Sequence, residues 1–351
     1  MFIGITGSQS SGKHTIAQYL VEQHHFQLLT LSSFTNTAGR EHLYSNAIQF
    51  ENVNKMQRYV TERWQEDFVT CDVDSRELWT LKKRPFFLLI SVEAPVTLRY
   101  KRWIERCQIE DRPPADLETF LIKDDRDLYN ISEKDQHEIN TITPLHNIMI
   151  ASDLVITNIY SDKSSLYKEL KRRNLTDKER LRPSWDTYFM QLSDLAARRS
   201  NCMKRRVGCI LVKDSRVIAT GYNGTPRGLR NCNEGGCGRC NEGAPCGTGL
   251  DRCLCMHAEE NALLEAGRGS NVALDNGVIL YCNTCPCLGC AIKIIQQGVK
   301  EVVYSLSYGM DQMTAKVFEE ANVKLRQHSA LSMPVELRTG IDEEVLLLNL
   351  K

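Results

Sequence analysis

Two short stretches decide how the second half of this chain folds: HAEENALLEAGR (257–268) and PCLGCAIKIIQQG (286–298). Each has the apolar spacing of an amphipathic helix and carries metal-binding side chains in its first turn. Cys287 and Cys290 lie three positions apart, so both thiolates face one side of the second helix. With His257 they supply three nitrogen and sulfur ligands, a set that holds zinc with an open fourth position. The two stretches therefore predict neighbouring helices whose N-termini share one metal site.

Glu259 lies two positions after the histidine and is not needed as a ligand. An open zinc position binds water and lowers its pKa to about 7, and a carboxylate beside it can move protons to and from a substrate. A helix N-terminus also favours the thiolate form of Cys287 and Cys290. The alternative is a structural zinc site, which would close its fourth position with another Cys or His.

The composition excludes several classes of protein. The 351 residues include 44 basic and 44 acidic side chains, whereas proteins that coat nucleic acid have a basic surplus. The run FFLLISV (86–92) is too short to span a bilayer, and no signal peptide is recognisable. We therefore expect a soluble cytoplasmic protein, which can also be nuclear, with no nucleic acid or membrane as partner.

The 14 cysteines are unevenly distributed, because all except Cys71 and Cys107 fall between Cys202 and Cys290. In a reducing compartment, such a cluster indicates metal binding rather than disulfides. The sequence therefore predicts zinc as the principal cofactor.

The N-terminal half opens with a buried strand, a glycine-rich loop and a helix. GSQSSGK (7–13) fits the P-loop pattern G-x-x-x-x-G-K. Gly7, Gly12 and Lys13 are candidates to bind a nucleotide phosphate, because the backbone N–H groups of such a loop cradle phosphate at a helix N-terminus. His14 stands where the pattern needs a Ser or Thr hydroxyl for Mg²⁺. We therefore predict the shape of a nucleotide site without its metal ligand.

Strands and helices alternate through the rest of this half. FFLLISVEAP (86–95) and SDLVITN (152–158) have the pattern of buried strands, so we expect an α/β domain with a parallel sheet over residues 1–172. Three arginines recur between them at helical spacing and either hold phosphate as part of a lid or form a solvated helix face: Arg99, Arg102 and Arg106.

A charged stretch at 173–184 contains Pro183 and is the predicted linker. A second domain is expected over 185–330, followed by a C-terminal tail at 331–351. The runs VGCILVK and RVIATGYN predict a hairpin with its turn at Asp214-Ser215. Further strands are expected at 278–283, 301–306 and 323–327, and helices beginning at 185, 257, 287 and 312. This order predicts a five-stranded mixed sheet with helices on both faces.

The pattern H-x-E followed by P-C-x-x-C is the signature of zinc deaminases that act on nucleobases. Four segments give a closer resemblance to the deoxycytidylate (dCMP) deaminase family: SNCMKRRVG, GYNGTPRG, HAEENALLEAGR and NTCPCLGCAIKIIQQGVKEVVY. The resemblance covers residues 185–330 and implies a cytidine-deaminase-like α/β/α domain that hydrolyses dCMP to dUMP and ammonia, supplying dUMP for dTMP synthesis. It also implies zinc ligands at His257, Cys287 and Cys290, with Glu259 moving the protons.

The first half resembles the P-loop nucleoside-monophosphate and dephospho-coenzyme A kinases, in GSQSSGK, VEAPVTLRYKR and SDLVITN. A kinase-like extension of this kind is similar to that of the two-domain fungal dCMP deaminases. Because of His14, we expect a degenerate kinase fold that binds a nucleotide or a partner without phosphoryl transfer. One departure lies beside the metal ligands, where the family pattern T-x-x-P-C has Asn283 in place of Thr and Thr284 one position later.

The resemblance implies that Asn223, in GYNG, contacts the sugar or base and that Tyr308 packs on the cytosine ring. The alternatives are a turn asparagine, since Y-N-G is a turn signal, and a core aromatic. A 5′-phosphate needs a cation or a cluster of N–H groups. One or two of five basic residues flanking the first hairpin are expected to supply it: Lys204, Arg205, Arg206, Arg227 and Arg230.

A second group of cysteines lies in the Gly-rich stretch before His257. The resemblance implies a structural zinc with ligands at Cys202, Cys232 and Cys255, and with Cys237 or Cys240 as the fourth. A loop of about 30 residues with little apolar content buries no core of its own, and a metal can order it. The alternative is a set of free thiols.

The resemblance also implies a homo-oligomer, often a hexamer, that dCTP activates and dTTP with Mg²⁺ inhibits, with GYNGTPRG in the regulatory surface. Three other functions stay open from the residues alone. They are deamination of another cytosine or adenine compound, a P-loop nucleotide kinase or sensor, and a zinc-based interaction module.

Overall fold

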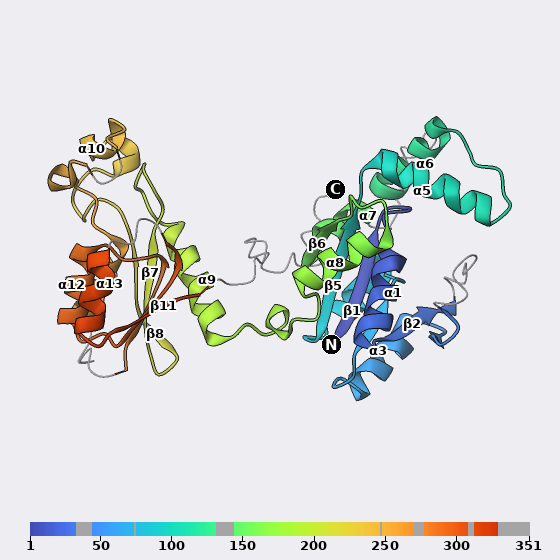
Figure 1. Ribbon diagram of the computed structural model, residues 1–351, viewed down its shortest axis with the longest axis horizontal. Helices are drawn as coiled ribbons and strands as arrows, with labels where there is room; N and C mark the ends of the chain where they lie inside the picture. Colours follow the sequence, from blue (N-terminus) through green and yellow to red (C-terminus); the bar gives the residue numbers. More distant parts are fainter. Residues whose placement is uncertain are drawn as a thin grey trace. The chain divides into compact units, whose positions relative to one another are not determined.

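The computed structural model describes residues 1–32, 44–73, 75–130, 144–245, 248–269, 277–307 and 312–328. The chain divides into two compact units, with the boundary between Arg182 and Pro183 (Figure 1). Each unit has its own sheet and its own hydrophobic core.

The first unit contains a six-stranded sheet in which every pairing is parallel. The strands, in spatial order, are β3 (Ile48–Phe50), β2 (Gln27–Leu31), β4 (Phe68–Thr70), β1 (Phe2–Gly7), β5 (Phe87–Glu93) and β6 (Leu154–Thr157). All six residues of the central strand β1 are buried, as expected for a parallel strand covered on both faces. The predicted parallel α/β sheet is confirmed.

Helices cover both faces of this sheet, and the alternation of side chains along β1 explains how. Ile3 and Ile5 pack with α1 (Lys13–His24) and α8 (Lys163–Arg173), whereas Phe2 packs with residues of α3 (Val53–Glu62), α4 (Ser75–Lys82) and α7 (Leu145–Ile150). Two further helices, α5 (Val96–Ile109) and α6 (Leu117–Tyr129), form a smaller cluster around Trp103 and Phe120.

The first unit extends further along the chain than the predicted boundary at residue 172. Helix α8 ends at Arg173, where Asn174 adopts a left-handed conformation. Leu175 is buried in the core of the first unit, and Arg180 donates a hydrogen bond to the carbonyl of Arg173 at 2.6 Å. Residues 173–182 of the predicted linker 173–184 therefore pack as part of the first unit. The predicted tail, 331–351, lies outside the described residues.

The second unit contains a five-stranded mixed sheet, as predicted. Its strands, in spatial order, are β11 (Lys324–Gln327), β10 (Glu301–Leu306), β9 (Ile279–Thr284), β7 (Gly208–Lys213) and β8 (Arg216–Tyr222). Strands β9, β10 and β11 run parallel, while β7 is antiparallel to both of its neighbours. Asp214 and Ser215 both have positive φ, which is the geometry of the two-residue turn predicted there.

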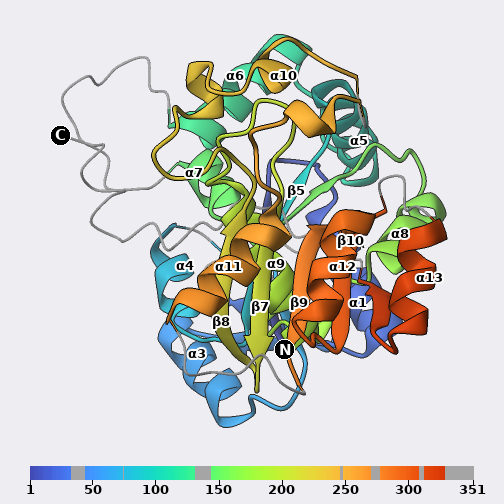
Figure 2. The same cartoon turned by 90° about the vertical axis from the view of Figure 1, so that its left-hand side faces the viewer.

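Helices again cover both faces (Figures 1 and 2). Helix α9 (Trp185–Ala197) covers one face, where Phe189 and Met190 pack on Ile210 and Tyr281. The opposite face, which includes Leu211, packs against α11 (Ala258–Gly269), α12 (Leu288–Gln296) and α13 (Gln312–Glu320). Helix α11 precedes the central strand β9 and α12 follows it. The N-termini of these two helices therefore lie at the same end of the sheet, where β9 ends.

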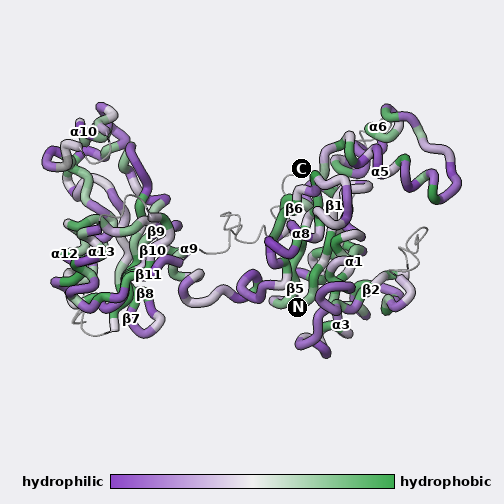
Figure 3. Tube along the Cα trace, in the orientation of Figure 1, coloured by the Kyte–Doolittle hydropathy of each residue, from purple (hydrophilic) through white to green (hydrophobic). Residues whose placement is uncertain are grey.

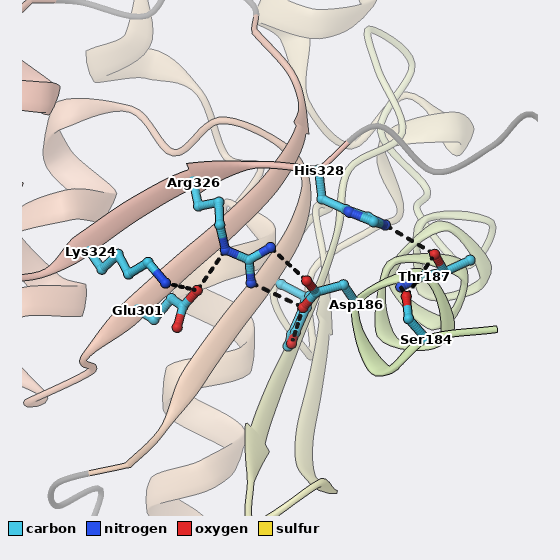
Figure 4. Close-up of polar contacts among 8 residues, drawn as sticks. Ser184, Asp186, Thr187, Glu301, Lys324, Arg326 and His328 are labelled. Carbon is cyan, nitrogen blue, oxygen red and sulfur yellow. Dashed lines mark hydrogen bonds and ion pairs between the residues drawn. The ribbon is translucent and has the colours of Figure 1, made fainter. Parts of the chain in front are cut away.

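A polar network ties α9 to the parallel edge of this sheet (Figure 4). Asp186, in the first turn of α9, accepts two hydrogen bonds from the Arg326 guanidinium of β11, at 2.6 and 3.0 Å, and one from the Tyr281 hydroxyl at 2.8 Å. Arg326 also donates to Glu301 of β10 at 2.8 Å. Ser184 caps α9, and the His328 ring contacts the Thr187 hydroxyl at 3.1 Å.

Hydrophobic residues are concentrated in the two sheets (Figure 3). Among the helices that the structure describes, none has both the length and the apolar content needed to cross a bilayer.

Candidate metal centre and nucleotide sites

The three predicted zinc ligands meet at the N-termini of α11 and α12. His257 immediately precedes α11, Cys287 caps α12, and Cys290 lies in the first turn of α12. The Nδ1 atom of His257 lies 3.3 Å from the Cys290 sulfur and 3.4 Å from the Cys287 sulfur. Within the described part of the chain, these three side chains form a group whose ligand atoms all lie within 4.8 Å of one another, with no fourth side chain in the group.

The carboxyl group of Glu259 lies beside these ligands and is shielded from solvent. Glu259 is 4% exposed, in the first turn of α11, and its side chain makes a hydrogen bond with Cys290. Burial raises the pKa of this carboxyl group above its ordinary value. A carboxyl group with a raised pKa can accept and release a proton near neutral pH, which is what proton transfer at this site needs.

The charges of the three ligands suit a cation. Hydrogen bonding from Cys290 and from the His257 ring lowers the pKa of the Cys287 thiol to about 4. The contact with Cys287 is in turn the main reason that the pKa of His257 is raised. One imidazole and two thiols, one of them with a lowered pKa, fit Zn²⁺ with a fourth position left open.

Glu260 and Lys293, which the sequence analysis did not single out, hold the two ligand-bearing helices together. The Glu260 carboxylate accepts a hydrogen bond from the His257 backbone N–H at 3.0 Å, and its other oxygen pairs with Lys293 of α12. The spacing from His257 to Glu260 is that of a capping box, in which an acidic side chain bonds back to the N-cap backbone. That signal was present in the sequence HAEE.

The Asn223 side chain is buried and bonded to a neighbouring loop. Its Oδ1 atom accepts hydrogen bonds from the Ser200 hydroxyl at 2.7 Å and the Val207 N–H at 2.8 Å, and its Nδ2 atom donates to the carbonyl of Arg205 at 2.8 Å. Asn223 therefore fixes the conformation of residues 200–207. Tyr308, the other predicted substrate contact, lies outside the described residues.

The five basic candidates for phosphate binding have different surroundings. Lys204 donates to the carbonyl of Ala244 in the cysteine-rich loop, and Arg227 pairs with Glu265 at 3.9 Å while 84% exposed. Arg205 is half-buried, whereas Arg206 and Arg230 are exposed. Lys204 thus has a structural contact that the sequence did not indicate.

Asn283, which departs from the family pattern, has a structural role. Its Oδ1 atom accepts a hydrogen bond from the Gly208 N–H at 3.1 Å, and its side chain also bonds to Asp194 of α9. Asn283 therefore joins β9 to the start of β7 and to the helix that covers them.

The predicted second metal site, of four ligands chosen from five candidate cysteines, lies within a larger cluster of six cysteines. The sulfur atoms gather in two overlapping groups of four, and in each group all four lie within 4.8 Å of one another. The five predicted residues are joined by Cys253, whose sulfur lies 3.8 Å from that of Cys240 and 3.9 Å from that of Cys237. Both groups together contain Cys202, Cys232, Cys237, Cys240, Cys253 and Cys255, named below the six-cysteine cluster.

The predicted P-loop connects β1 to α1. Gly12 caps α1 with φ of 105°, a left-handed conformation, and a Cβ atom there would collide with the amide nitrogen of Asn158. Asn158 donates a hydrogen bond to the carbonyl of Ser11 at 2.8 Å, and Lys13 donates to the carbonyl of Gly7 at 3.3 Å. Glycine at position 12 is therefore required by the loop itself.

The three arginines of α5 contact the loop region, which excludes the solvated-face alternative. Arg99 is buried in a bidentate pair with Asp124, at 2.5 and 2.7 Å. Arg102 donates to the carbonyls of Ser10 and Ser11, both at 3.3 Å, and Arg106 donates to the Ser10 hydroxyl at 2.8 Å.

Asp72, which was not predicted, lies at the end of β4 near Lys13. It is buried and accepts hydrogen bonds from the Thr30 hydroxyl at 2.6 Å and the Leu31 N–H at 2.8 Å. Burial raises its pKa, while the charge of Lys13 acts in the opposite direction.

Comparison with known proteins identifies the family. Residues 183–306 match the cytidine and deoxycytidylate deaminase zinc-binding region. The deoxycytidylate deaminase of Schizosaccharomyces pombe is 46% identical over 328 residues, which are 93% of this chain and 97% of that protein. The chain belongs to the deoxycytidylate deaminase family. The deoxycytidylate deaminase of Saccharomyces cerevisiae is 40% identical over 343 residues, covering 95% of this chain and 98% of the relative.

The first half of the chain is thus shared with both yeast deaminases. A shorter relative is matched by only part of this chain: the deoxycytidylate deaminase of Mycobacterium phage D29 is 41% identical over 128 residues, which are 35% of this chain but 95% of that protein. The family predicted from the sequence is confirmed, and so is its zinc-binding region.

Proposed function

We propose that this chain hydrolyses dCMP to dUMP and ammonia at the site formed by His257, Glu259, Cys287 and Cys290. The observation that carries the proposal is the grouping of three ligand atoms within 4.8 Å beside a buried carboxyl group. Two relatives that match more than nine-tenths of the chain are deoxycytidylate deaminases. The dUMP formed would supply dTMP synthesis.

The side chains of this site have two roles, metal binding and proton transfer. His257, Cys287 and Cys290 would hold Zn²⁺, which when bound supplies an activated water to attack the C4 atom of cytosine. Glu259 takes the proton from the attacking water, protonates the ring nitrogen, and delivers a proton to the departing ammonia. Its burial keeps competing bulk water from this proton transfer.

A nucleotide substrate such as dCMP requires a site that binds its 5′-phosphate. Basic residues flank the first hairpin, and we assign one or two of them to the 5′-phosphate, with Asn223 and Tyr308 near the sugar and base. Turnover of dCMP, cytidine and single-stranded DNA should be measured side by side. We expect dCMP to be preferred by a large factor, whereas equal turnover of free cytidine would contradict the phosphate site. Preference for DNA would favour the polynucleotide alternative.

The cysteine-rich loop would hold structural zinc. The three predicted ligands Cys202, Cys232 and Cys255 form one group of four sulfur atoms with Cys240, one of the two candidates for the fourth position. Four cysteines give the closed coordination typical of a structural site. Thiols stay reduced and able to bind metal in a reducing compartment, so we place the protein in the cytoplasm, with the nucleus as the second compartment to test.

The first unit would bind a nucleotide without transferring phosphate. Its P-loop geometry is supported by the left-handed Gly12, and Lys13, Arg102 and Arg106 surround the loop with positive charge. His14 supplies no hydroxyl for Mg²⁺, so any Mg²⁺ would arrive with the nucleotide. The nucleotides to test are dCTP as activator and dTTP with Mg²⁺ as inhibitor.

Lys13→Ala separates this assignment from a kinase. Binding of ATP, dCTP and dTTP to the full chain should be measured by calorimetry, together with phosphoryl transfer to nucleoside monophosphates. We expect Lys13→Ala to weaken nucleotide binding and expect no phosphoryl transfer by either protein. Transfer that disappears in Lys13→Ala would establish an active kinase instead. GYNGTPRG (221–228) is the alternative place for effector binding, and unchanged effector response in Lys13→Ala would favour it.

We also propose that the chain forms a homo-oligomer, with a hexamer as the expected assembly. Leu264 on α11 and Ile292 on α12 are each 57% exposed on the outer helices of the second unit. A contiguous exposed apolar patch marks an association surface, and we place that surface on these two helices. Light scattering of the purified protein gives the assembly directly.

A further inference from the structure

The six-cysteine cluster is built from three separate segments, each with its own local geometry. Cys237 caps the short helix α10 (Gly238–Asn241), which places Cys240 on the same side one turn later. Cys253 and Cys255 lie two positions apart and both belong to the cluster, while Leu254 between them is 47% exposed. Cys202 and Cys232 complete the cluster. Cys246 of the same loop lies outside the described residues.

The spacing of the sulfur atoms agrees with metal coordination and not with disulfides. Neighbouring sulfurs are separated by 3.8 to 3.9 Å, whereas a disulfide requires about 2.05 Å. A tetrahedron with zinc–sulfur bonds of about 2.3 Å has edges of about 3.8 Å. The cysteines are also free in the structure.

The sulfur atoms form two groups of four that share two members. One group contains Cys202, Cys232, Cys240 and Cys255, and the other contains Cys237, Cys240, Cys253 and Cys255. Cys240 and Cys255 belong to both, and their sulfurs lie 3.9 Å apart. We propose that the six-cysteine cluster binds two zinc ions in one binuclear site, in which Cys240 and Cys255 bridge the ions and the other four cysteines each bind one.

Hydrogen-bond donors surround the four terminal sulfurs. The backbone N–H of Met203 donates to Cys232, and that of Leu254 donates to Cys237, each at 3.4 Å. The Arg239 guanidinium lies 3.5 Å from the Cys253 sulfur, and backbone N–H groups of the Lys204–Arg205 segment donate to Cys202. Two Zn²⁺ against six thiolates leave a formal charge of −2, which these donors and cations offset.

The composition of the cysteine-rich loop favours stabilisation by metal ions. Figure 3 shows the region around α10 as mostly hydrophilic, and a segment with few apolar side chains has little else to stabilise its fold. The cluster ends two residues before His257, and Met256 pairs with Gly224 through hydrogen bonds of 2.9 and 3.2 Å. The binuclear site would therefore fix the chain that leads into the deaminase metal centre. The proposal holds whichever substrate that centre deaminates.

Two simpler arrangements predict different results. A single ion could occupy either group of four, leaving the two outer cysteines of the other group as free thiols. In that case one of the variants Cys202→Ser and Cys253→Ser would keep its full zinc content. In a binuclear site both would lose zinc, because each removes a ligand from a different ion.

The first test is zinc content per chain, measured by native mass spectrometry and elemental analysis on the full protein purified under reducing conditions. We expect three ions in the wild type and two in Cys287→Ala, which removes the catalytic ligand only. Two in the wild type and one in Cys287→Ala would overturn the binuclear proposal. An unchanged content in Cys287→Ala would instead contradict the catalytic site, so the two failures are distinguishable.

The second test compares Cys202→Ser and Cys253→Ser with Cys107→Ala, a control at a buried thiol of the first unit. We expect three ions in the control and at most two in each cluster variant. Full zinc content in either cluster variant would refute the proposal that Cys240 and Cys255 bridge two zinc ions.

A third measurement avoids variants that fail to fold. X-ray absorption at the zinc edge on Cys287→Ala, whose cluster residues are all intact, should show all-sulfur coordination and a zinc–zinc scattering peak. All-sulfur coordination without that peak would exclude a pair of bridged ions.

Discussion

Glu259 and Glu260 are adjacent in sequence, yet the first turn of α11 gives them different environments. Successive positions of a helix are rotated by about 100°, so Glu259 faces the metal ligands and is 4% exposed, while Glu260 faces Lys293 on the neighbouring helix. The carboxyl group of Glu259 is therefore placed to move protons, whereas that of Glu260 is placed to orient the metal ligands.

Replacing Glu260 by alanine should weaken metal binding without removing a ligand. The variant loses the hydrogen bond to the His257 backbone and the ion pair with Lys293. Groups that orient metal ligands typically contribute a factor of 10 to 100 in affinity or activity, so we expect zinc affinity to fall about 10-fold. Competition with a fluorescent chelator measures this.

Glu320→Ala is the matched control, because Glu320 forms an exposed pair with Lys316 at 3.8 Å on α13. Exposed pairs contribute little, so its zinc affinity should equal that of the wild type. Equal affinities for both variants would show that Glu260 has no positioning role.

Asn223→Ala distinguishes a loop-fixing residue from a substrate contact. The change removes the hydrogen bonds that Asn223 makes with the Val207 N–H and with the Arg205 carbonyl, and the loss of such bonds costs about 1 to 3 kcal/mol. We expect a lower unfolding temperature as well as a higher KM for dCMP. A raised KM with unchanged thermal stability would mean that Asn223 acts on substrate alone.

At the scale of whole elements, the network around Arg326 connects parts of the second unit that are far apart in sequence. Asp186 of α9 and Arg326 of β11 are separated by 140 positions, and Glu301 of β10 completes the network (Figure 4). The network holds the first helix of the unit against its last strand. Side chains here are about 30% exposed or less, so solvent screens the ion pairs only partly.

Asp186→Asn should lower the unfolding free energy of the second unit by about 1 kcal/mol, since it removes the charge from a hydrogen-bonded pair. The Arg326 guanidinium holds the pKa of Asp186 below its ordinary value. The carboxylate then stabilises the fold above the unfolded pKa of about 3.9 and loses this effect as pH falls through the folded pKa.

The difference between wild type and Asp186→Asn should therefore stay constant from pH 7 to pH 5. Unfolding of the full chain in urea gives this difference at each pH, when the release of zinc is used as the signal for unfolding of the second unit. A difference that already shrinks between pH 7 and pH 5 would show that the pKa of Asp186 is not lowered.

At the scale of the molecule, the sequence predicted both sheets because each depends on local patterns. Buried strands, the P-loop glycines and the Asp214-Ser215 turn are all fixed within a few residues. The predicted linker was too long, because Leu175 reaches the first core through a contact that no local pattern records. Cys253 was missed for the same reason, since its partners come from three segments brought together only by folding.

The second unit should bind zinc and deaminate dCMP in the absence of the first unit. It has its own sheet and core, and the phage relative is matched over 95% of its length by little more than a third of this chain. We expect the chain from Pro183 onward to bind zinc and to turn over dCMP within about 10-fold of the full protein. Loss of zinc from this fragment would show that the first unit is needed for the metal centre.

The most direct test of the account is dCMP turnover and zinc content measured together on Glu259→Gln. General acid–base groups contribute about 10²- to 10⁴-fold to rate, so turnover should fall at least about 100-fold while the zinc content equals that of the wild type. Wild-type turnover in Glu259→Gln with its zinc retained would contradict the assignment of this carboxyl group as the proton carrier beside the metal.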